Sequence, residues 1–496
     1  MSVAIVVALV LAAAAALVLL RQSPGEAMQV LAQRSPVEMI GEAMRRLEGH
    51  PNLERLLLPP LTWLRGRFVR EPAPGVPLRD LGKGIRPFGL TPQAYDAQGR
   101  PLAASPSAAE PRPVPSTRVL LSGAEIAAAV QAAQPGDVLE IAPGRYALPA
   151  TLHTGRGGRA DAPITLRAAR PGTVTLEVRS VEGIVVSQPY WIFENLGWVG
   201  LCKADDECEH AFHIVGDARS TVVRNQRIVD FSAHLKINGH QGRFPDDGLL
   251  QFSTLVNTRP RVGEAPVTFV DLVAASGWQY LDNHVEGFVK QGSNGISYGM
   301  FMKGAGQRGR IERNLVVCTP TGVAQPGLRL GISIGGGTSG VGACRDQRCA
   351  VEFTGAIVAN NVVAHCNDAG IDVNKSGSVL VLHNTLVNTQ GVLVRNPPAE
   401  ASVQNNLLDG GRVRHRSGTT LSADAGNGSG AAAAMMTPDA LDLRWREAPE
   451  PVATPAPVPL DFCGRRRGAL SEPGAGAAAA CPGAWSAAAA AATEGR

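Results

Sequence analysis

The sequence predicts an all-β fold, a right-handed parallel β-helix with an amino-terminal capping helix, preceded by a transmembrane helix. Three observations predict it: Asn-containing turns that recur in the second half, strand segments that begin with glycine and can be superposed, and an apolar run at the amino terminus. The 496 residues include 56 glycines and only 18% charged residues, a composition that suits a solenoid rich in turns.

Residues 1–22 form the first element. The run from Val3 to Leu20 has 18 apolar residues, close to the length that crosses a bilayer as a helix. A cleaved signal normally has a charged start and a shorter apolar core, although the alanines at 12–16 offer a cleavage site. We favour an uncleaved anchor, with a cleaved signal and a buried soluble helix as alternatives.

Two patterns disagree about which side of the membrane the rest of the chain faces. Arg21 and Arg34 follow the apolar run and no basic residue precedes it, which favours the cytoplasm. Eight cysteines, including the close pairs Cys202/Cys208 and Cys344/Cys349 in polar stretches, favour an oxidising compartment. Since each pair could pin a loop, we expect a periplasm-facing protein, or a secreted one if the segment is cleaved. Free thiols or a zinc site are the alternatives for these cysteines.

Three further segments flank the expected solenoid. Residues 23–70 are expected to form a helical juxtamembrane segment, and the Pro/Ala-rich residues 71–118 a linker. Residues 428–496, rich in Ala, Pro and Gly, are expected to be disordered, with a disulfide between Cys463 and Cys481 as an option. The net charge of +4 and the lack of basic clusters with interleaved aromatics argue against a nucleic-acid partner.

The β-helix domain is expected over 119–427 and opens with a short helix. Ser122 is a suitable N-cap with Glu125 three residues on, and Ile126 and Val130 supply an apolar face. A strand-like alternation follows at 136–146. Such a helix would cover the open end of the solenoid, whose edge would otherwise recruit other strands.

Recurring turns define the coils. Strand-like residues flank six asparagines: Asn225, Asn283, Asn314, Asn361, Asn384 and Asn405. The last three lie 23 and 21 residues apart, and the earlier gaps of 58, 31 and 47 indicate coils with insertions. Asparagine tolerates left-handed backbone and its amide can bond to the next coil, so we expect an asparagine ladder.

The strand segments predict an outer face. Segments that begin at Ala233, Gly299, Gly331, Gly370 and Gly391 can be superposed, and alternate residues such as Met300 and Met302 then fill the core. The remaining residues point outward in two adjacent columns. One column reads Lys236, Phe301, Ser333, Asp372 and Leu393, and the other reads Asn238, Lys303, Gly335, Asn374 and Arg395. We expect these columns to line a shallow groove for a chain-like substrate.

Several motifs resemble a known family. The entry AAQPGDVLEIAPGRY at 132–146, followed by APITLRA at 162–168, resembles the start of the chondroitinase B and alginate lyase family of parallel β-helix polysaccharide lyases. Met302-Lys303-Gly304 with the turn at 310–314 is similar to that family's lysine-bearing strand. The resemblance covers roughly residues 119 to 425, and these motifs specify a fold better than an activity.

The resemblance implies that Lys303 removes the proton from C5 of a uronic acid, that an arginine assists, and that calcium offsets the substrate carboxylate. Where the family has its arginine, this chain has Ser333 and Gly335, while Arg329 and Arg345 flank the glycine run. No clear Asn/Glu/Glu set for calcium is present, so calcium rests on resemblance alone and no metal ligand is assigned. The catalytic candidates are Lys303, Arg329 and Asp372, and the substrate-binding candidates are Lys236, Asn238, Ser333, Asn374, Arg395 and Lys290.

We therefore expect a membrane-anchored protein that acts on an acidic polysaccharide by β-elimination or C5 epimerisation. A non-catalytic carbohydrate-binding or envelope scaffold protein is the alternative, because the same groove serves both. Glycoside hydrolysis needs two carboxyls about 5 to 9.5 Å apart, and Asp246–Asp247, the tempting pair, reads as a solvated turn. His365 and His383 precede turn residues and are expected to be structural.

Overall fold

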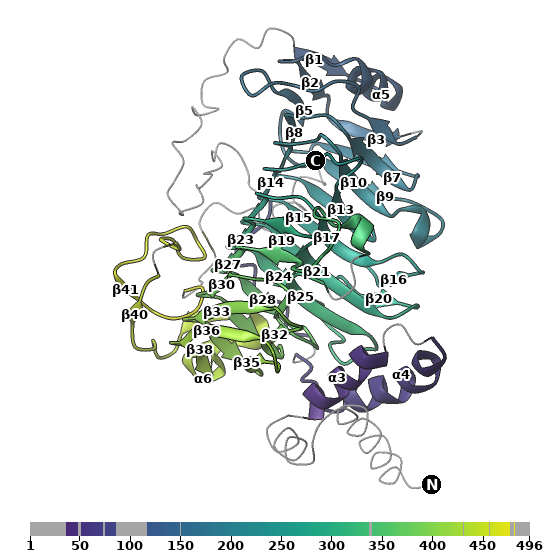
Figure 1. Ribbon diagram of the computed structural model, residues 1–496. Coiled ribbons are helices and arrows are strands. Elements are labelled where there is room, and N and C mark those ends of the chain that lie inside the picture. Colours follow the sequence, from purple (N-terminus) through teal and green to yellow (C-terminus); the bar gives the residue numbers. More distant parts are fainter. Residues whose placement is uncertain are drawn as a thin grey trace.

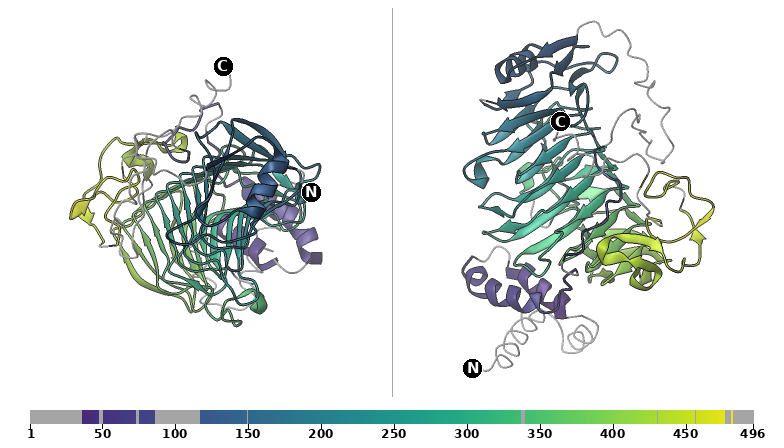
Figure 2. Two further views of the ribbon diagram at one scale, coloured as in Figure 1. Left: turned by 90° about the horizontal axis from the view of Figure 1, so that it is seen from above. Right: turned by 180° about the vertical axis from the view of Figure 1, so that it is seen from behind.

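The computed structural model describes residues 36–47, 51–72, 75–85, 117–148, 150–336, 340–429, 431–455, 457–476 and 481. Three long parallel sheets stack into a solenoid, and each coil contributes one strand to each sheet (Figures 1 and 2). In the order in which a coil visits them we call these sheets 1, 2 and 3, with 12, 11 and 10 strands. The predicted parallel β-helix is confirmed.

The strands of each sheet pair in the order of the coils. Sheet 1 contains β1 (Thr117–Leu120), β2 (Val138–Ile141), β5 (Ile164–Ala168), β8 (Trp191–Glu194), β11 (Val222–Arg224), β14 (Leu249–Gln251), β18 (Gln279–Leu281), β23 (Arg310–Glu312), β27 (Ile357–Ala359), β30 (Val379–Leu382), β33 (Glu400–Gln404) and β36 (Thr420–Ala425). Sheet 2 contains β3 (Gly144–Leu148), β6 (Val174–Val178), β9 (Gly197–Gly200), β12 (Arg227–Val229), β15 (Thr254–Val256), β19 (His284–Glu286), β24 (Leu315–Val317), β28 (Val362–Ala364), β31 (Thr385–Val387), β34 (Leu407–Asp409) and β37 (Gly428–Ser429). Sheet 3 contains β4 (Leu152–His153), β7 (Glu182–Val186), β10 (His210–Val215), β13 (Ala233–Asn238), β17 (Val267–Val273), β21 (Ile296–Lys303), β25 (Leu328–Ile334), β29 (Ile371–Asn374), β32 (Gly391–Arg395) and β35 (Arg412–His415).

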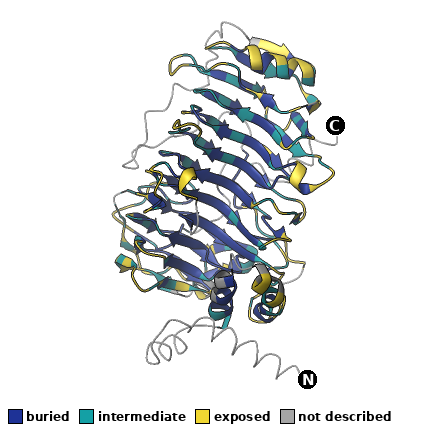
Figure 3. Cartoon of the chain, turned by 45° about the vertical axis from the view of Figure 1, so that its right-hand side comes forward, coloured by how far each residue is buried: buried dark blue, intermediate teal, exposed yellow. Residues whose placement is uncertain are grey.

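A continuous apolar core runs through the stack because inward residues of successive coils lie one above the other (Figure 3). The first coils fill it with aromatic rings: Phe193 and Phe212 lie 5.3 Å apart between centroids, and Trp198 lies 4.8 Å from Phe212. Later coils use Ile, Val and Met, including Met300 and Met302 as predicted. No single coil could bury these side chains alone.

The asparagine ladder exists, but its members differ in part from the prediction. Asn314 Nδ2 donates to Asn361 Oδ1 at 2.9 Å, and Asn283 and Asn384 continue the same pattern. Asn406, and not Asn405, extends it to Asn427. Two adjacent turn positions therefore share two properties that were expected of a single asparagine, namely left-handed backbone and the ladder of side-chain hydrogen bonds.

The first of these two positions takes left-handed backbone and the second carries the ladder. Asn225 and Asn405 occupy the first position, with φ of 56° and 58°, as expected of left-handed asparagines. Asn225 Nδ2 donates to Asn195 Oδ1 of the preceding coil at 2.7 Å, whereas Asn405 Nδ2 contacts His383 and lies beside the main ladder. Asp282, Arg313 and His383 occupy the same left-handed position in other coils. Because several residue types are accommodated there, only the second position shows a clear asparagine signal.

The capping helix α5 (Gly123–Ala132) is confirmed at the start of the stack (Figure 1). The Ser122 side chain accepts a hydrogen bond from the Glu125 amide at 3.2 Å, and Glu125 accepts from the Leu121 amide at 2.7 Å. Ile126 and Val130 are fully buried against the first coil. The helix therefore seals the end of the core as the sequence indicates.

The segment at 23–70 is helical in its described part and packs on the β-helix itself. Helices α3 (Pro36–Leu47) and α4 (Pro51–Gly66) form a hairpin beside the last coils of sheet 3 (Figure 3). Ile40, Met44 and Leu47 recur at helical spacing and pack with Leu393 of β32 in one apolar cluster. The hairpin is thus a part of the domain and packs against β21, β25 and β32 of sheet 3.

Both flanking segments expected to lack fixed structure are ordered where they are described. In the linker, Leu81 is buried against sheet 2, and buried Lys83 donates to Asp282 at 2.8 Å. The expectation of a disordered tail at 428–496 is wrong for the described residues, because Leu443 and Phe462 pack on the outer face of sheet 2. Its elements are α6 (Ala431–Ala434), β38 (Met435–Thr437), β39 (Asp442–Trp445), β40 (Val452–Ala453) and β41 (Leu470–Ser471).

All eight cysteines are paired. Cys202–Cys208 and Cys344–Cys349 form the two predicted loop bridges, Cys463–Cys481 the optional one, and Cys318–Cys366 a fourth that was not predicted. This excludes the alternatives of free thiols and of a zinc site. No helix in the described ranges has the length and apolarity to cross a membrane, and the run from Val3 to Leu20 lies outside those ranges.

We expect acid to destabilise the fold through buried histidines. The His234 ring lies 3.9 Å from that of Phe269 in the core, and burial lowers its pKa to about 3; burial and the charge of Arg467 likewise lower the pKa of His383 to about 3. In the unfolded chain the pKa is about 6.5, so below that pH the unfolded state binds more protons. The melting temperature should therefore fall as the pH drops from about 6.5 towards 3.

The variant His234→Phe tests this pH dependence. Phenylalanine keeps a flat ring against Phe269 and removes the titrating nitrogens, so the melting temperature should fall less per pH unit. The substitution also removes the hydrogen bond to the Val256 carbonyl, which lowers stability at neutral pH but does not affect the slope. Exposed His240→Gln serves as the control and should leave the slope unchanged. An unaltered slope in His234→Phe would contradict the assignment.

Candidate functional site

The outer face of sheet 3 carries the two predicted columns. In the strand register, Lys236 pairs with Asp271, Asp271 with Phe301, and the row continues through Ser333, Asp372 and Leu393. Asn238 pairs with Val273, which pairs with Lys303. The columns were therefore predicted correctly except for one coil, β17, which lies between Lys236 and Phe301 and lacks the leading glycine.

The lower half of this face is closed. Ser333 and Asp372 are fully buried and Asn374 is 2% exposed, while Leu393 packs under the hairpin. Arg395 donates to Asp372 from Nε and Nη2, both at 2.9 Å. The expectation that these residues bind or act on a substrate is corrected, because their polar atoms pair with one another beneath covering chain.

Two further candidates lie away from the open groove. Arg329 is 1% exposed, and its guanidinium donates to the carbonyls of Val323, Gln325 and Pro326. It holds a loop and does not reach the groove, so its catalytic assignment is corrected as well. Lys290 is 4% exposed, donates to the Glu264 carbonyl at 3.2 Å, and lines a separate cleft of about 600 Å³ between the hairpin and the turn at 291–295.

The upper half of the face is open and polar. It brings together three predicted residues, Lys236, Asn238 and Lys303, with three that the sequence reading missed: Glu182 of β7, His213 of β10 and Asp271 of β17. Of the missed strands, β10 and β17 lack the leading glycine, whereas β7 has Gly183 at the place of Gly299 but lies before the segments that were superposed. Counting coils from the turns, and not from glycines, would have found them.

His213 lies between two acceptors. Its Nδ1 is 2.5 Å from Glu182 Oε1, and its Nε2 is 2.9 Å from Asn238 Oδ1. The hydrogen bond from His213, which outweighs burial, lowers the pKa of Glu182, and the charges of His213, His210 and His153 act in the same direction. Glu182 is therefore an ionised partner that fixes the orientation of the imidazole.

Asp271 lies between two lysines. Burial would raise its pKa, but the charges of Lys236 and Lys303 and a hydrogen bond from Lys236 Nζ at 2.5 Å lower it. Asp271 Oδ1 is buried without a hydrogen-bond partner, as is Nδ1 of nearby His210, whose pKa burial lowers to about 4. Both polar atoms are therefore buried beneath this face without a hydrogen-bond partner among the described residues.

Lys303, unlike Lys236, has no ion pair with Asp271. Its Nζ lies 4.7 Å from the centroid of the Phe301 ring, and within the described residues it forms no ion pair. A Cβ on Gly336 would lie 2.8 Å from Phe301 Cζ and 3.3 Å from Lys303 Cδ. Gly336 thus lets the backbone pass close against this strand.

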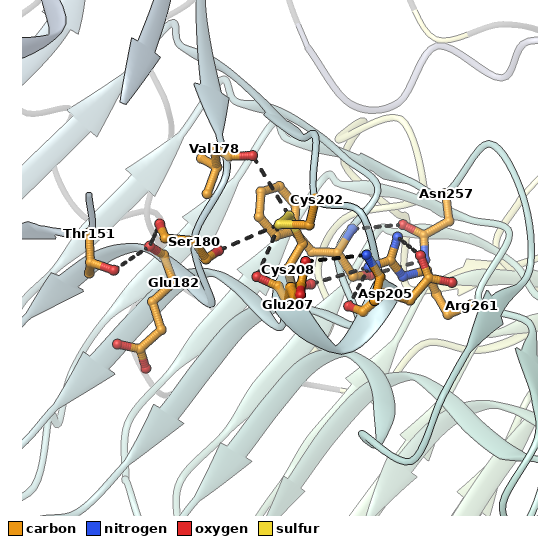
Figure 4. The surroundings of a disulfide bond; sticks show 12 residues. Thr151, Val178, Ser180, Glu182, Cys202, Asp205, Glu207, Cys208, Asn257 and Arg261 are labelled. Atoms are coloured by element: carbon orange, nitrogen blue, oxygen red, sulfur yellow. Dashed lines mark hydrogen bonds and ion pairs between the residues drawn. A yellow bond between two sulfur atoms is a disulfide. The ribbon is translucent and has the colours of Figure 1, made fainter. Parts of the chain in front are cut away.

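Two disulfide-bonded loops border the strands of this face: the Cys202–Cys208 loop directly precedes β10, and the Cys344–Cys349 loop contacts the chain just after β17 and β21. The Cys202–Cys208 loop is held by Asp205, which is ion-paired with Arg261 at 3.0 Å (Figure 4). Arg345 of the Cys344–Cys349 loop is ion-paired with Asp246 at 2.8 Å. Both carboxylate oxygens of Asp246 bind the Arg345 guanidinium, so the pair Asp246–Asp247 does not form a hydrolytic site.

The expected structural role of two histidines is supported by their contacts. His365 Nε2 is 3.0 Å from the Asp439 carbonyl, and its Nδ1 is 3.1 Å from Asn388 Nδ2. His383 Nε2 is 3.1 Å from Asn405 Nδ2. Both rings tie turns together away from the groove.

The groove does not fit calcium. Among the described residues, the one close cluster of metal-ligating types is Cys344, Cys349 and Glu352, and its two sulfurs are joined in a disulfide. In the groove, Asp271 lies beside Lys236 and Lys303, whose charges repel a divalent cation. Calcium also prefers six to eight oxygen ligands. The lysines occupy the place where a cation would have to sit.

Comparison with known proteins gives similar folds at low identity. No family model and no curated protein matches the chain. Similar solved structures include an alginate lyase from Paenibacillus sp. str. FPU-7 (17% identity, 64% of this chain and 95% of the other, TM-score 0.38) and a rhamnogalacturonan lyase (13%, 60% and 80%, 0.41). A GH87 α-1,3-glucanase from Streptomyces thermodiastaticus is also similar (16%, 62% and 65%, 0.37). The chain is thus similar to polysaccharide lyases, as its motifs indicate, but likeness at this level carries no argument about activity.

Proposed function

We propose that this protein acts on an acidic polysaccharide in the upper groove of sheet 3, by removing the proton from C5 of a uronic acid residue. The observation that carries the proposal is the arrangement of Lys236 and Lys303 on either side of Asp271 in an open groove. Lysines favour a carboxylate-bearing chain.

Each residue has a role in this reaction. Lys236 offsets the negative charge of the substrate carboxylate, which makes the C5 hydrogen more acidic. Lys303, in its neutral form, takes the C5 proton on Nζ. The electron pair of the broken C5–H bond then forms the C4=C5 double bond as the C4–O4 bond breaks, and O4 receives a proton. Return of a proton to the opposite face of C5 would give epimerisation in place of cleavage.

The proposal includes where the protein works. Four disulfides suit an oxidising compartment, and the run from Val3 to Leu20 suits a membrane anchor or a signal segment. A periplasm-facing or secreted protein would meet envelope or environmental polysaccharides there.

The test is to incubate the purified chain with alginate, chondroitin, dermatan and pectate and to follow the ultraviolet absorbance of an unsaturated uronate. We expect absorbance to rise with at least one polymer, and a chelator to leave the rate unchanged because lysines do the work of a metal. Incubation in deuterated water, with NMR of the sugar, detects epimerisation as exchange at C5. Binding without exchange or cleavage would instead support the non-catalytic alternative.

A further inference from the structure

We infer that His213 is the proton donor to the departing O4 oxygen and that Glu182 is the residue that positions it. This inference rests on the proposed function, because it assigns the acid that completes the same elimination. Nothing in the family resemblance assigns a histidine here. Three observations carry it: the hydrogen bonds of the ring, its exposure, and its place relative to Lys303.

The contacts place an acceptor oxygen beside each nitrogen of the His213 ring. Asn238 Nδ2 donates to the Gly239 carbonyl at 3.0 Å, which turns Asn238 Oδ1 towards His213 Nε2. The carboxylate of Glu182 faces Nδ1. With an acceptor on each side, the geometry is that of an imidazolium, the protonated form that a general acid needs.

The ring is also open to a substrate. The exposed fraction of the His213 side chain is 23%, and the side chains of Glu182 and Lys236 are exposed to a similar degree, 24% and 26%. A substrate oxygen can therefore replace the contact of Nε2 with Asn238. The Glu182 contact at Nδ1 stays in place, so the ring keeps its orientation while the Nε2 proton is transferred.

The charged groups around the ring come from every neighbouring strand. His210 on the same strand lies 5.6 Å away between ring centroids. Glu182 of β7 stabilises the imidazolium, Lys236 of β13 opposes it, and Asp271 of β17 is tied to Lys236. Exposed His153 of β4 stands at the start of the same column. Glu209, just before β10, also acts on the ring through its charge, but among the described residues the carboxylate in ion-pair contact with the ring is Glu182.

The position of His213 matches a polymer that lies along the sheet. The strand of His213 lies three rungs from that of Lys303, but His213 Nε2 reaches one rung towards it and meets Asn238, which stands in the column of Lys303 two rungs, roughly 10 Å, away. Val273 lies between them and leaves a shallow floor for a sugar ring. A uronate whose C5 faces Lys303 then directs its O4, and the preceding sugar, towards His213.

The step is balanced without any co-reactant. Lys303 gains the C5 proton, and the C5–H electrons form the C4=C5 bond. The C4–O4 electrons go to O4, which takes the Nε2 proton of His213. The products are an unsaturated uronate and a free hydroxyl end, with neutral His213 and protonated Lys303. Net transfer of one proton from Lys303 to His213 through solvent restores the enzyme.

The variant His213→Gln separates the acid from the base. We expect its elimination rate on polymer to fall about 100- to 10,000-fold. Exchange of the C5 hydrogen in deuterated water should continue, because Lys303 is intact. A synthetic uronide with dinitrophenolate at C4, which leaves without protonation, should be cleaved at close to the wild-type rate. The exposed histidine variant His240→Gln should behave as wild type throughout.

Glu182→Gln tests the positioning role. The amide oxygen can still accept from Nδ1, so the fold is kept, but the negative charge is lost. We expect the alkaline fall of the pH–rate profile on polymer to move to lower pH, with the dinitrophenyl substrate unaffected. A merely structural role for Glu182 would lower both activities together and leave the profile in place.

The outcomes are distinguishable. Full polymer cleavage by His213→Gln, or equal losses on both substrates, would overturn the assignment of His213 while leaving the proposed function standing. A wild-type protein that neither exchanges C5 hydrogen nor cleaves the synthetic uronide would overturn both. Circular dichroism and the melting temperature of each variant show whether a loss of activity reflects unfolding.

Discussion

Replacing Lys303 with methionine is expected to lower the rate of unsaturated uronate formation by about 100- to 10,000-fold, because general base catalysis contributes a factor of this size. Methionine keeps an unbranched side chain over Phe301, so the strand and its contact with Gly336 are retained. The measurement is the initial rate of absorbance increase on the most active polymer. Circular dichroism and the melting temperature should match those of the wild type.

A second substitution decides whether Lys303 acts as a base or only as a cation. Lys303→Arg keeps the positive charge but stays protonated at any working pH, so it should be as inactive as Lys303→Met if the proton is taken by Nζ. Lys375→Met is the matched control, because Lys375 follows β29 at the same edge of sheet 3. Activity retained in Lys303→Arg would reduce Lys303 to a binding charge.

Much of this architecture could be predicted because solenoids repeat. The turn asparagines gave the coil length, and alternation in Met300 and Met302 gave the inward face, so the outward columns followed. What repeats in sequence is also adjacent in space, which is unusual among folds. Left-handed backbone was expected at all six turn asparagines, but of these only Asn225 and Asn405 have it, and residues as different as Arg313 and His383 occupy the same position in other coils.

The extent of the open groove could not be predicted in the same way. Which half is covered depends on where residues 36–66 pack, a contact between segments more than 300 residues apart, as in the pair between Glu38 and Arg412. An amphipathic helix shows that it has a partner but does not show which one. Sequence columns therefore gave the same weight to Asp372, which is sealed, and to Lys236, which is open.

The sealed ion pair leads to a stability prediction. Asp372 is fully buried and accepts two hydrogen bonds from Arg395. Burial lowers the pKa of the Arg395 guanidinium, but the charge and hydrogen bonds of Asp372 outweigh burial and raise it. Arg395→Met leaves this carboxylate without its counter-charge. We expect a loss of about 3 to 5 kcal/mol in unfolding free energy, measured by chemical denaturation.

The double variant Asp372→Leu/Arg395→Met should recover most of that loss, since apolar residues often replace a buried pair at little cost. Arg444→Met breaks an exposed pair with Asp442 and should leave the denaturation midpoint unchanged. Activity of the double variant on polymer is the decisive reading. If Asp372 and Arg395 oriented the sugar, the folded double variant would be inactive. If they only stabilise the covered part of the face, the double variant should cleave the polymer as fast as the wild type. That result would confine the reaction to the upper groove.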